Sequence, residues 1–219
     1  MLDRPLLMVV IAVSTYWTGV LVMVLLARRC GAPSAGLLPT ELGERALWLI
    51  WVPVIICWIA FPLLAMTQDD PPWVLPGYAN KPGFQLLPPA IFHHPAYLAL
   101  RWIAGIGTLA CLALTIACWA RMGRNWRIGV VPDDHAQLVT TGAYRYVRHP
   151  IYALSVALMV GTAIVAPIWP IILIAILHIT FMNLKARNEE RFLKNLHGDR
   201  YIQYMRHTGR FLPRRHLKA

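Results

Sequence analysis

The feature that most constrains this chain is an uncharged stretch from Ile151 to Leu184 that two prolines interrupt near its middle. As one α-helix it would measure about 51 Å, whereas the hydrocarbon core of a bilayer is about 30 Å thick. Pro167 and Pro170 remove backbone donors and restrict the residues that precede them. We therefore expect two helices joined by a tight turn at Ala166 to Pro170, each arm short for a full span.

Three further stretches have the length and apolar character of membrane spans: Pro5 to Ala27, Ala46 to Met66, and Tyr97 to Ala120, which has Arg101 near its start. Apolar residues make up 58% of the chain and charged residues only 14%, which is outside the usual range of soluble domains. The predicted fold class is all-α, a polytopic membrane helix bundle with about five transmembrane helices, including the C-terminal hairpin, and a cytoplasmic amphipathic helix.

The positive charges indicate an orientation. With five spans, Lys and Arg are sparse before the first span, between the second and third, and in the hairpin turn, whereas the tail from Lys185 onward carries ten of them. Basic residues gather on the cytoplasmic side of membrane proteins. We expect an integral protein of the cytoplasmic membrane with its N-terminus outside and its C-terminus inside. The net charge of +11 then reflects topology and anionic membrane lipids rather than nucleic acid.

We expect one integral membrane domain over residues 1–219, with three spans and a loop in residues 1–120 and a cofactor-binding half in residues 121–213. The proline-rich stretch from Thr67 to Ala96 is predicted to lie along the outer interface. No metal site is expected, because His93 and His94 lack Cys or carboxylate ligands at suitable spacing. His178 is interpreted as a core or cavity histidine.

Polar residues gather in two segments, Met122 to Tyr152 and Lys185 to Pro213. The hairpin returns the chain to the side it left, so both segments are expected at one cytoplasmic cavity mouth. Pro150 favours a helix start, where backbone donors beside Arg148 suit a carboxylate. An interfacial anchor, with Arg148 and Tyr152 at lipid headgroups, is an equal alternative.

The second segment is predicted to form an amphipathic helix with Glu189 in the middle of its apolar stripe. A carboxylate there requires a cationic partner, either a ligand amine or Arg148. Glu190 lies at the edge of the stripe, four residues before Lys194, and by itself is compatible with a surface ion pair.

These segments carry two motifs. The first is His135-Ala-Gln-Leu138-Val139-Thr-Thr-Gly142-Ala-Tyr144-Arg-Tyr-Val-Arg148-His149-Pro150-Ile-Tyr152, and the second is Glu189-Glu190-Arg-Phe-Leu193-x-x-x-His197-Gly198-x-x-Tyr201-x-x-Tyr204, closing with Arg210-Phe-Leu-Pro213. Both resemble signatures of the isoprenylcysteine carboxyl methyltransferase family, which is related to the phospholipid methyltransferases. Gly123-Arg124-Asn125-Trp126 also looks similar to that family.

The resemblance implies a helical membrane enzyme that binds S-adenosyl-L-methionine without a Rossmann domain. The residues it places at the cofactor are His135, Leu138, Val139, Gly142, Tyr144, His149, Pro150, Tyr152, Glu189 and Glu190. It implies a catalytic set of Arg148, Glu189, Glu190 and Arg210, with Arg148 at the reaction centre. His197 replaces the family's usual Phe and His207 its frequent Arg, and Arg206 or Arg210 is close enough in sequence to substitute for the latter.

The expected activity is methyl transfer to a lipophilic acceptor, first a carboxylate such as isoprenylcysteine. A phospholipid amine or a small thiol is an alternative acceptor. A membrane sterol or steroid reductase that uses NADPH is an alternative enzyme class, against which the glutamate pair argues. A structural or transport protein on the same scaffold is the non-enzymatic alternative, and it predicts no binding of S-adenosylhomocysteine.

Overall fold

The computed structural model describes residues 3–29, 42–66, 86–122 and 138–214. Within these ranges the chain is helical and contains no strand, only an isolated bridge. The elements are α1 (Arg4–Arg29), α2 (Leu42–Met66), α3 (Pro89–Phe92), α4 (Pro95–Met122), η3 (Gly142–Arg145), α5 (Pro150–Val165), α6 (Trp169–His197) and α7 (Asp199–His207).

The all-α membrane fold predicted from the sequence is confirmed. Among the described residues, α1, α2, α4 and α6 are long and apolar enough to cross a membrane. The fourth predicted span, α5, is a shorter apolar helix of 16 residues, about 24 Å long. Pro53 and Pro62 lie inside α2, as membrane helices tolerate when their neighbours compensate the freed backbone groups.

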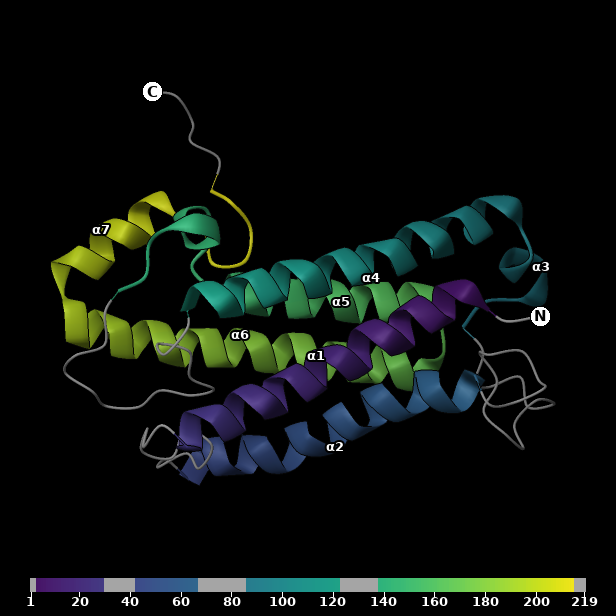
Figure 1. The fold of residues 1–219 in the computed structure, drawn as a ribbon, viewed down its shortest axis with the longest axis horizontal. Helices are drawn as coiled ribbons and strands as arrows, with labels where there is room; N and C mark the ends of the chain where they lie inside the picture. Colours follow the sequence, from purple (N-terminus) through teal and green to yellow (C-terminus); the bar gives the residue numbers. More distant parts are fainter. Residues whose placement is uncertain (1–2, 30–41, 67–85, 123–137, 215–219) are drawn as a thin grey trace.

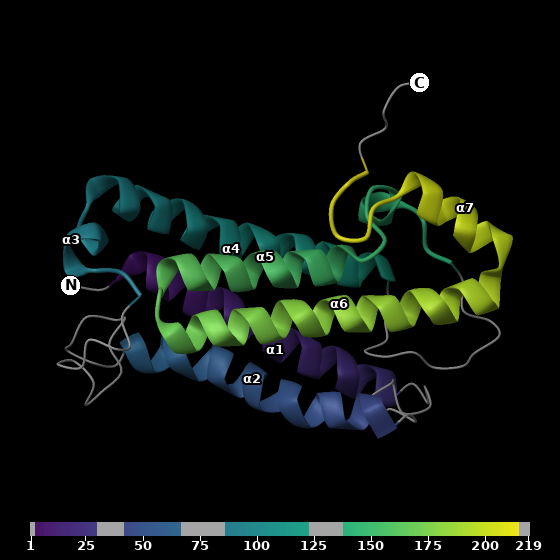
Figure 2. The same ribbon diagram turned by 180° about the vertical axis from the view of Figure 1, so that it is seen from behind.

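The predicted hairpin forms the C-terminal half of the bundle. α5 ends at Val165 and α6 begins at Trp169, so the break falls in the proline segment. Its turn lies at the end of the molecule that carries α3 and the N-terminus, as Figures 1 and 2 show. α6 then runs back past the start of α5 to the opposite end, where α7 lies (Figure 2).

One boundary differs from the prediction. The expected separate amphipathic helix around Glu189 is the last part of α6, continuous with the fifth span. α6 ends at His197, and the Gly198 that follows has a backbone φ of +52°, a value that favours glycine. The chain then turns into α7, and this turn places the C-terminal segment back over the end of the bundle (Figure 1).

Polar groups within the bundle pair with one another. The Trp58 indole donates to Thr162 Oγ1 at 3.1 Å, and Ser155 Oγ lies 2.9 Å from His178 Nε2. His178 is fully buried, which agrees with its interpretation as a core histidine. No cluster of three potential metal ligands occurs among the residues that were placed.

A buried ion pair joins three helices at the end opposite α7. Arg101 of α4 is 3% exposed, and its guanidinium donates to Asp3 Oδ2 at 2.5 Å and to the Val165 carbonyl at 3.1 Å. Asp3 also accepts the backbone N–H of Leu6 and so caps α1. Arg101 therefore ties the start of α1 to the Val165 carbonyl at the end of α5.

Candidate functional site

The segment that precedes α5 is held by the C-terminal segment. Val147 and Gly209 form a parallel bridge, and the Arg148 backbone N–H donates to the Gly209 carbonyl at 2.8 Å. From α7, the Tyr204 hydroxyl donates to the Tyr144 carbonyl at 2.5 Å. Two polar segments about sixty residues apart in sequence thus become one unit at the α7 end of the bundle.

Glu190 is the electrostatic centre of this unit. Its Oε1 accepts from Arg148 Nε at 3.0 Å and from Arg210 Nε at 3.0 Å, and its Oε2 accepts from Arg210 Nη2 at 2.6 Å. The Glu190 side chain is only 4% exposed. Arg148 also donates to the carbonyls of Met205 and Thr208. One carboxylate therefore holds two guanidinium groups, and one of these holds the end of α7.

These contacts correct three expectations from the sequence. Glu190 does not form a surface pair with Lys194 but lies buried between Arg148 and Arg210. Arg148 pairs with Glu190 rather than Glu189, because neighbouring positions on a helix point about 100° apart. The Arg148 side chain is 9% exposed and is therefore not a headgroup anchor.

Glu189 faces a different set of partners. Its Oε1 accepts the Tyr152 hydroxyl, and its Oε2 lies 3.4 Å from His149 Nδ1. The His149 and Tyr152 rings stack at 5.4 Å between centroids. Burial alone lowers the pKa of His149, but hydrogen bonds and negative charge from Glu189 and Glu190 outweigh it and raise that pKa above its ordinary value. The Glu189 side chain is 20% exposed, so it is the more accessible of the two glutamates.

The other predicted cofactor residues are placed as follows. Tyr144 is buried with its hydroxyl 2.8 Å from the Met122 sulfur, Pro150 is the buried first residue of α5, and Leu138 and Val139 are half-buried. His135 and the segment 123–126 lie outside the described residues.

Gly142 opens the η3 turn with φ +65°, and a Cβ built there would lie 2.6 Å from Arg121 Nε. The backbone angle favours glycine, whereas the flexible Arg121 side chain can move away from an added Cβ. We expect Gly142→Ala to lower the free energy of unfolding by roughly 1 kcal/mol or more. Thermal unfolding in detergent would measure this, with Gly107→Ala as control because a Cβ there meets no atom within 4 Å. Equal melting temperatures for the two variants would contradict it.

Four residues at the site were not assigned roles from the sequence. Asn183 Oδ1 accepts from Arg210 Nη1 at 3.0 Å, and the buried Thr208 supplies its carbonyl to Arg148. His197 Nε2 and the Tyr201 hydroxyl are buried without a hydrogen-bond partner among the described residues. Asn183 could have been found, because it lies seven residues before Glu190 on the same face of α6.

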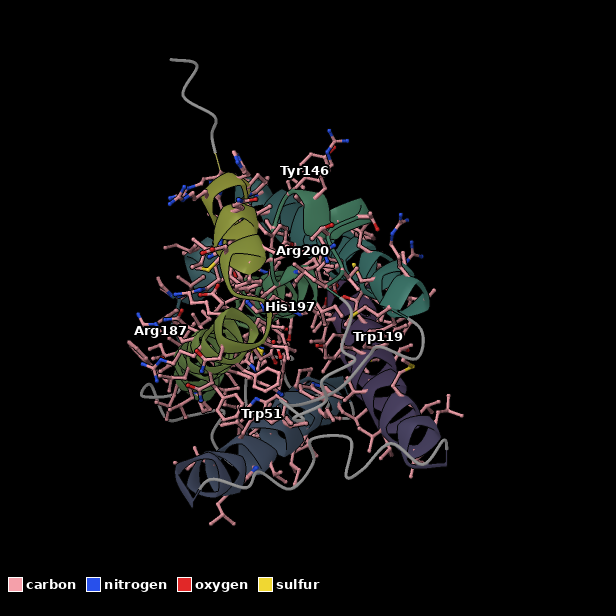
Figure 3. All side chains as sticks on the ribbon, turned by 90° about the vertical axis from the view of Figure 1, so that its left-hand side faces the viewer. Trp51, Trp119, Tyr146, Arg187, His197 and Arg200 are labelled. Atoms are coloured by element: carbon pink, nitrogen blue, oxygen red, sulfur yellow. The ribbon has the colours of Figure 1, made fainter. Side chains whose placement is uncertain are left out.

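Figure 3 views the bundle from the α7 end. His197 and Arg200 lie near the middle of this view, at the junction of α6 and α7, whereas Arg187 points away from the bundle on the outer side of α6. Trp51 of α2 and Trp119 of α4 lie on the inner sides of their helices, below and beside His197 (Figure 3). Residues from both halves of the chain thus surround this end.

The fold and this site define a helical integral membrane protein whose polar centre lies at one end of the bundle. Residues 100–200 match the family model described as phospholipid methyltransferase, a family related to the isoprenylcysteine carboxyl methyltransferases. This part of the chain, from α4 to the first turn of α7, is similar to that family, which supports a membrane methyltransferase in general terms. No curated protein matches the chain.

Proposed function

We propose that the protein transfers a methyl group from S-adenosyl-L-methionine to a lipophilic acceptor, with Glu189 as the carboxylate that contacts the cofactor. The observation that carries the proposal is that Glu189 and Glu190 have different partners and different exposure to solvent. Glu190 is saturated by three guanidinium hydrogen bonds, whereas Glu189 is more exposed, contacts Tyr152 and His149, and has the charge of Lys185 nearby rather than a guanidinium hydrogen bond. A cationic ligand therefore meets Glu189 first.

The surrounding residues fit this cofactor. S-adenosyl-L-methionine supplies a methyl group on a cationic sulfonium, together with an ammonium group, ribose hydroxyls and an adenine. Glu189 would accept from the ammonium or the hydroxyls, and the buried His197 Nε2 and Tyr201 hydroxyl are polar atoms that lack partners within the described part of the chain. Buried polar atoms of this kind are costly unless something bonds to them.

In this proposal Glu190 acts through other residues. It fixes the guanidinium groups of Arg148 and Arg210, and Arg148 in turn holds the C-terminal segment through backbone carbonyls. We propose that Arg148 and Arg210 set the charge at the reaction centre from these fixed positions. Such alignment contributes up to roughly 7 to 11 kcal/mol in well-oriented systems.

For the acceptor, we propose a lipophilic carboxylate such as isoprenylcysteine. The description of the matched family favours a phospholipid amine as the second candidate. Either acceptor would reach the site from surrounding membrane lipid, and no nucleic acid takes part. We further propose a single domain in the cytoplasmic membrane, N-terminus outside, so that the α7 end with its ten basic residues after Leu184 faces the cytoplasm.

The test is cofactor binding by the purified protein in lipid nanodiscs. S-adenosylhomocysteine is expected to bind and NADPH not, because Glu189 disfavours a phosphate-rich ligand. Glu189→Gln is expected to weaken S-adenosylhomocysteine binding at least tenfold, since a hydrogen bond to a charged group contributes about 1.5 to 3 kcal/mol. Isothermal titration calorimetry measures both affinities.

Asp199→Asn is the matched control, because it makes the same carboxylate-to-amide change at an exposed position of α7. It should bind S-adenosylhomocysteine like the native protein. Absence of binding by the native protein, or NADPH binding in its place, would refute the proposed function.

A further inference from the structure

We propose that cofactor binding displaces a proton from His149, whose imidazolium occupies the position between Glu189 and Glu190 in the free protein. The inference rests on the proposed function and deepens it by naming how the site is regulated. Protons and cofactor compete for one carboxylate, so the affinity for the cofactor should rise with pH. The identity of the acceptor does not enter the argument.

The His149 ring lies between the two carboxylates of α6. Its Nδ1 is 3.4 Å from Glu189 Oε2, and its Nε2 is 3.4 Å from Glu190 Oε1. The Tyr152 ring stacks on the imidazole, and the Phe211 ring meets it edge-on at 6.3 Å between centroids. The His149 side chain is only 6% exposed. Neighbouring rings therefore hold each ring nitrogen against a carboxylate oxygen.

This position suits a protonated histidine. A neutral imidazole has one donor and one acceptor nitrogen, whereas an ionised carboxylate only accepts. If His149 were neutral, a nitrogen lone pair would face a carboxylate lone pair on one side. Only the imidazolium donates toward both Glu189 and Glu190. In agreement, the two glutamates raise the pKa of His149 above its ordinary value, although burial alone would lower it.

The surroundings of His149 disfavour a further cation. Three cations act on its two carboxylate partners, because Arg148 and Arg210 bind Glu190 and the charge of Lys185 acts on Glu189. His149 also directly precedes α5, and the N-terminal end of a helix is positive. The titratable and charged groups placed around it are Glu189, Glu190, Lys185, Arg148, Arg210, Tyr144, Tyr152 and Tyr201. A cationic ligand at Glu189 is therefore repelled while His149 stays protonated.

Loss of one proton changes the site from donor to acceptor. When the Nδ1 proton of His149 passes to solvent, Nδ1 gains a lone pair and Glu189 Oε2 loses its donor. Nε2 keeps its hydrogen and still faces Glu190. Two acceptors then lie 3.4 Å apart, and one of them is a carboxylate oxygen. An ammonium group or a pair of ribose hydroxyls supplies donors for both, so each cofactor bound releases a proton to the buffer.

The direction of the pH dependence follows from this competition. Below the pKa of His149 in the free protein, the proton must be removed before the cofactor binds, so binding is weakened. The affinity for S-adenosylhomocysteine should therefore rise with pH, by at most about tenfold per pH unit, and level off above that pKa. Because that pKa is raised, the rise should extend above the ordinary range of histidine, to about pH 7 or higher.

The test is calorimetric titration of the full chain in nanodiscs of neutral lipid with S-adenosylhomocysteine. Titrations in PIPES and in ACES, two buffers of different ionisation enthalpy, give the number of protons released on binding. At about pH 7 the native protein should release between roughly one half and one proton per ligand. His149→Gln should release none, and its affinity should change less than about twofold between about pH 6 and 8. His94→Gln, at an exposed position after α3, is the matched control and should behave like the native protein.

The outcomes separate this inference from the proposed function. If the native protein does not bind S-adenosylhomocysteine, the proposed function is refuted. If it binds the ligand without proton release, or with an affinity that does not depend on pH, only the role of His149 is refuted. Proton release by His149→Gln equal to that of the native protein would assign the proton to another group and overturn the proposal. His149→Asn, which also lacks a titratable group, repeats the test if His149→Gln does not fold.

Discussion

Glu190→Gln is expected to lower the free energy of unfolding of the C-terminal unit by roughly 3 kcal/mol or more and to abolish methyl transfer. The substitution keeps the shape of the side chain and removes its charge, so Arg148 and Arg210 lose their shared counter-ion in a mostly buried position. Removing one partner of a buried ion pair typically costs about 3 to 5 kcal/mol. Arg148 should then release the carbonyls of Met205 and Thr208.

Limited proteolysis in nanodiscs measures this local effect, because cleavage between Asp199 and Arg210 requires α7 to leave the bundle. Asp199→Asn should be cleaved at the native rate, whereas Glu190→Gln should be cleaved at least tenfold faster. Native protection of α7 in Glu190→Gln would show that Glu190 does not hold the segment. The variant differs from Glu189→Gln, for which we expect an intact fold and weaker cofactor binding.

Arg101→Met is expected to produce the second large effect, at the opposite end of the bundle. The variant leaves Asp3 without its cation and the Val165 carbonyl without the guanidinium donor, so unfolding should become easier by roughly 3 kcal/mol or more. SDS-induced unfolding in mixed micelles measures the change. Because the Glu189 and Glu190 site lies at the other end, the folded variant should bind S-adenosylhomocysteine with native affinity.

The double-mutant cycle with Asp3→Asn separates the ion pair from other effects. Arg101→Met should lower the free energy of unfolding by less in the Asp3→Asn background than in the native protein. Arg4→Met, an exposed arginine at the same end, serves as the control. If the two substitutions lower the free energy of unfolding additively, the contact between Arg101 and Asp3 does not stabilise the bundle.

The positions of the spans were predictable because they depend on length and polarity alone. The uncharged stretch from Ile151 to Leu184 is too long for one span and had to fold back on itself in a bilayer. Pro167 and Pro170 indicated the position of the turn. Where helix length was not limited by an apolar stretch, prediction was weaker. The polar continuation of α6 to His197 has no proline or glycine before Gly198, so it extends the fifth span rather than forming a separate helix.

The sequence predicted which residues lie at the site, but not which carboxylate pairs with which cation. Periodicity identified Glu189 as a carboxylate in an apolar stripe, yet it could not show that the Glu190 side chain is the less solvent-exposed of the two. That outcome depends on where α7 and the segment around Gly209 dock, and hence on Arg210, whose partners Asn183 and Glu190 lie 27 and 20 residues away in sequence.

The sequence by itself determined that this chain is a membrane helix bundle with a C-terminal hairpin, because the cost of charge and of open backbone in lipid leaves few alternatives. It also brought the two polar segments to one end of that bundle. Only the tertiary structure decided which carboxylate meets which cation, and that His149 lies between the two carboxylates. Those pairings depend on distances between side chains from separate helices, and local patterns carry no information about such distances.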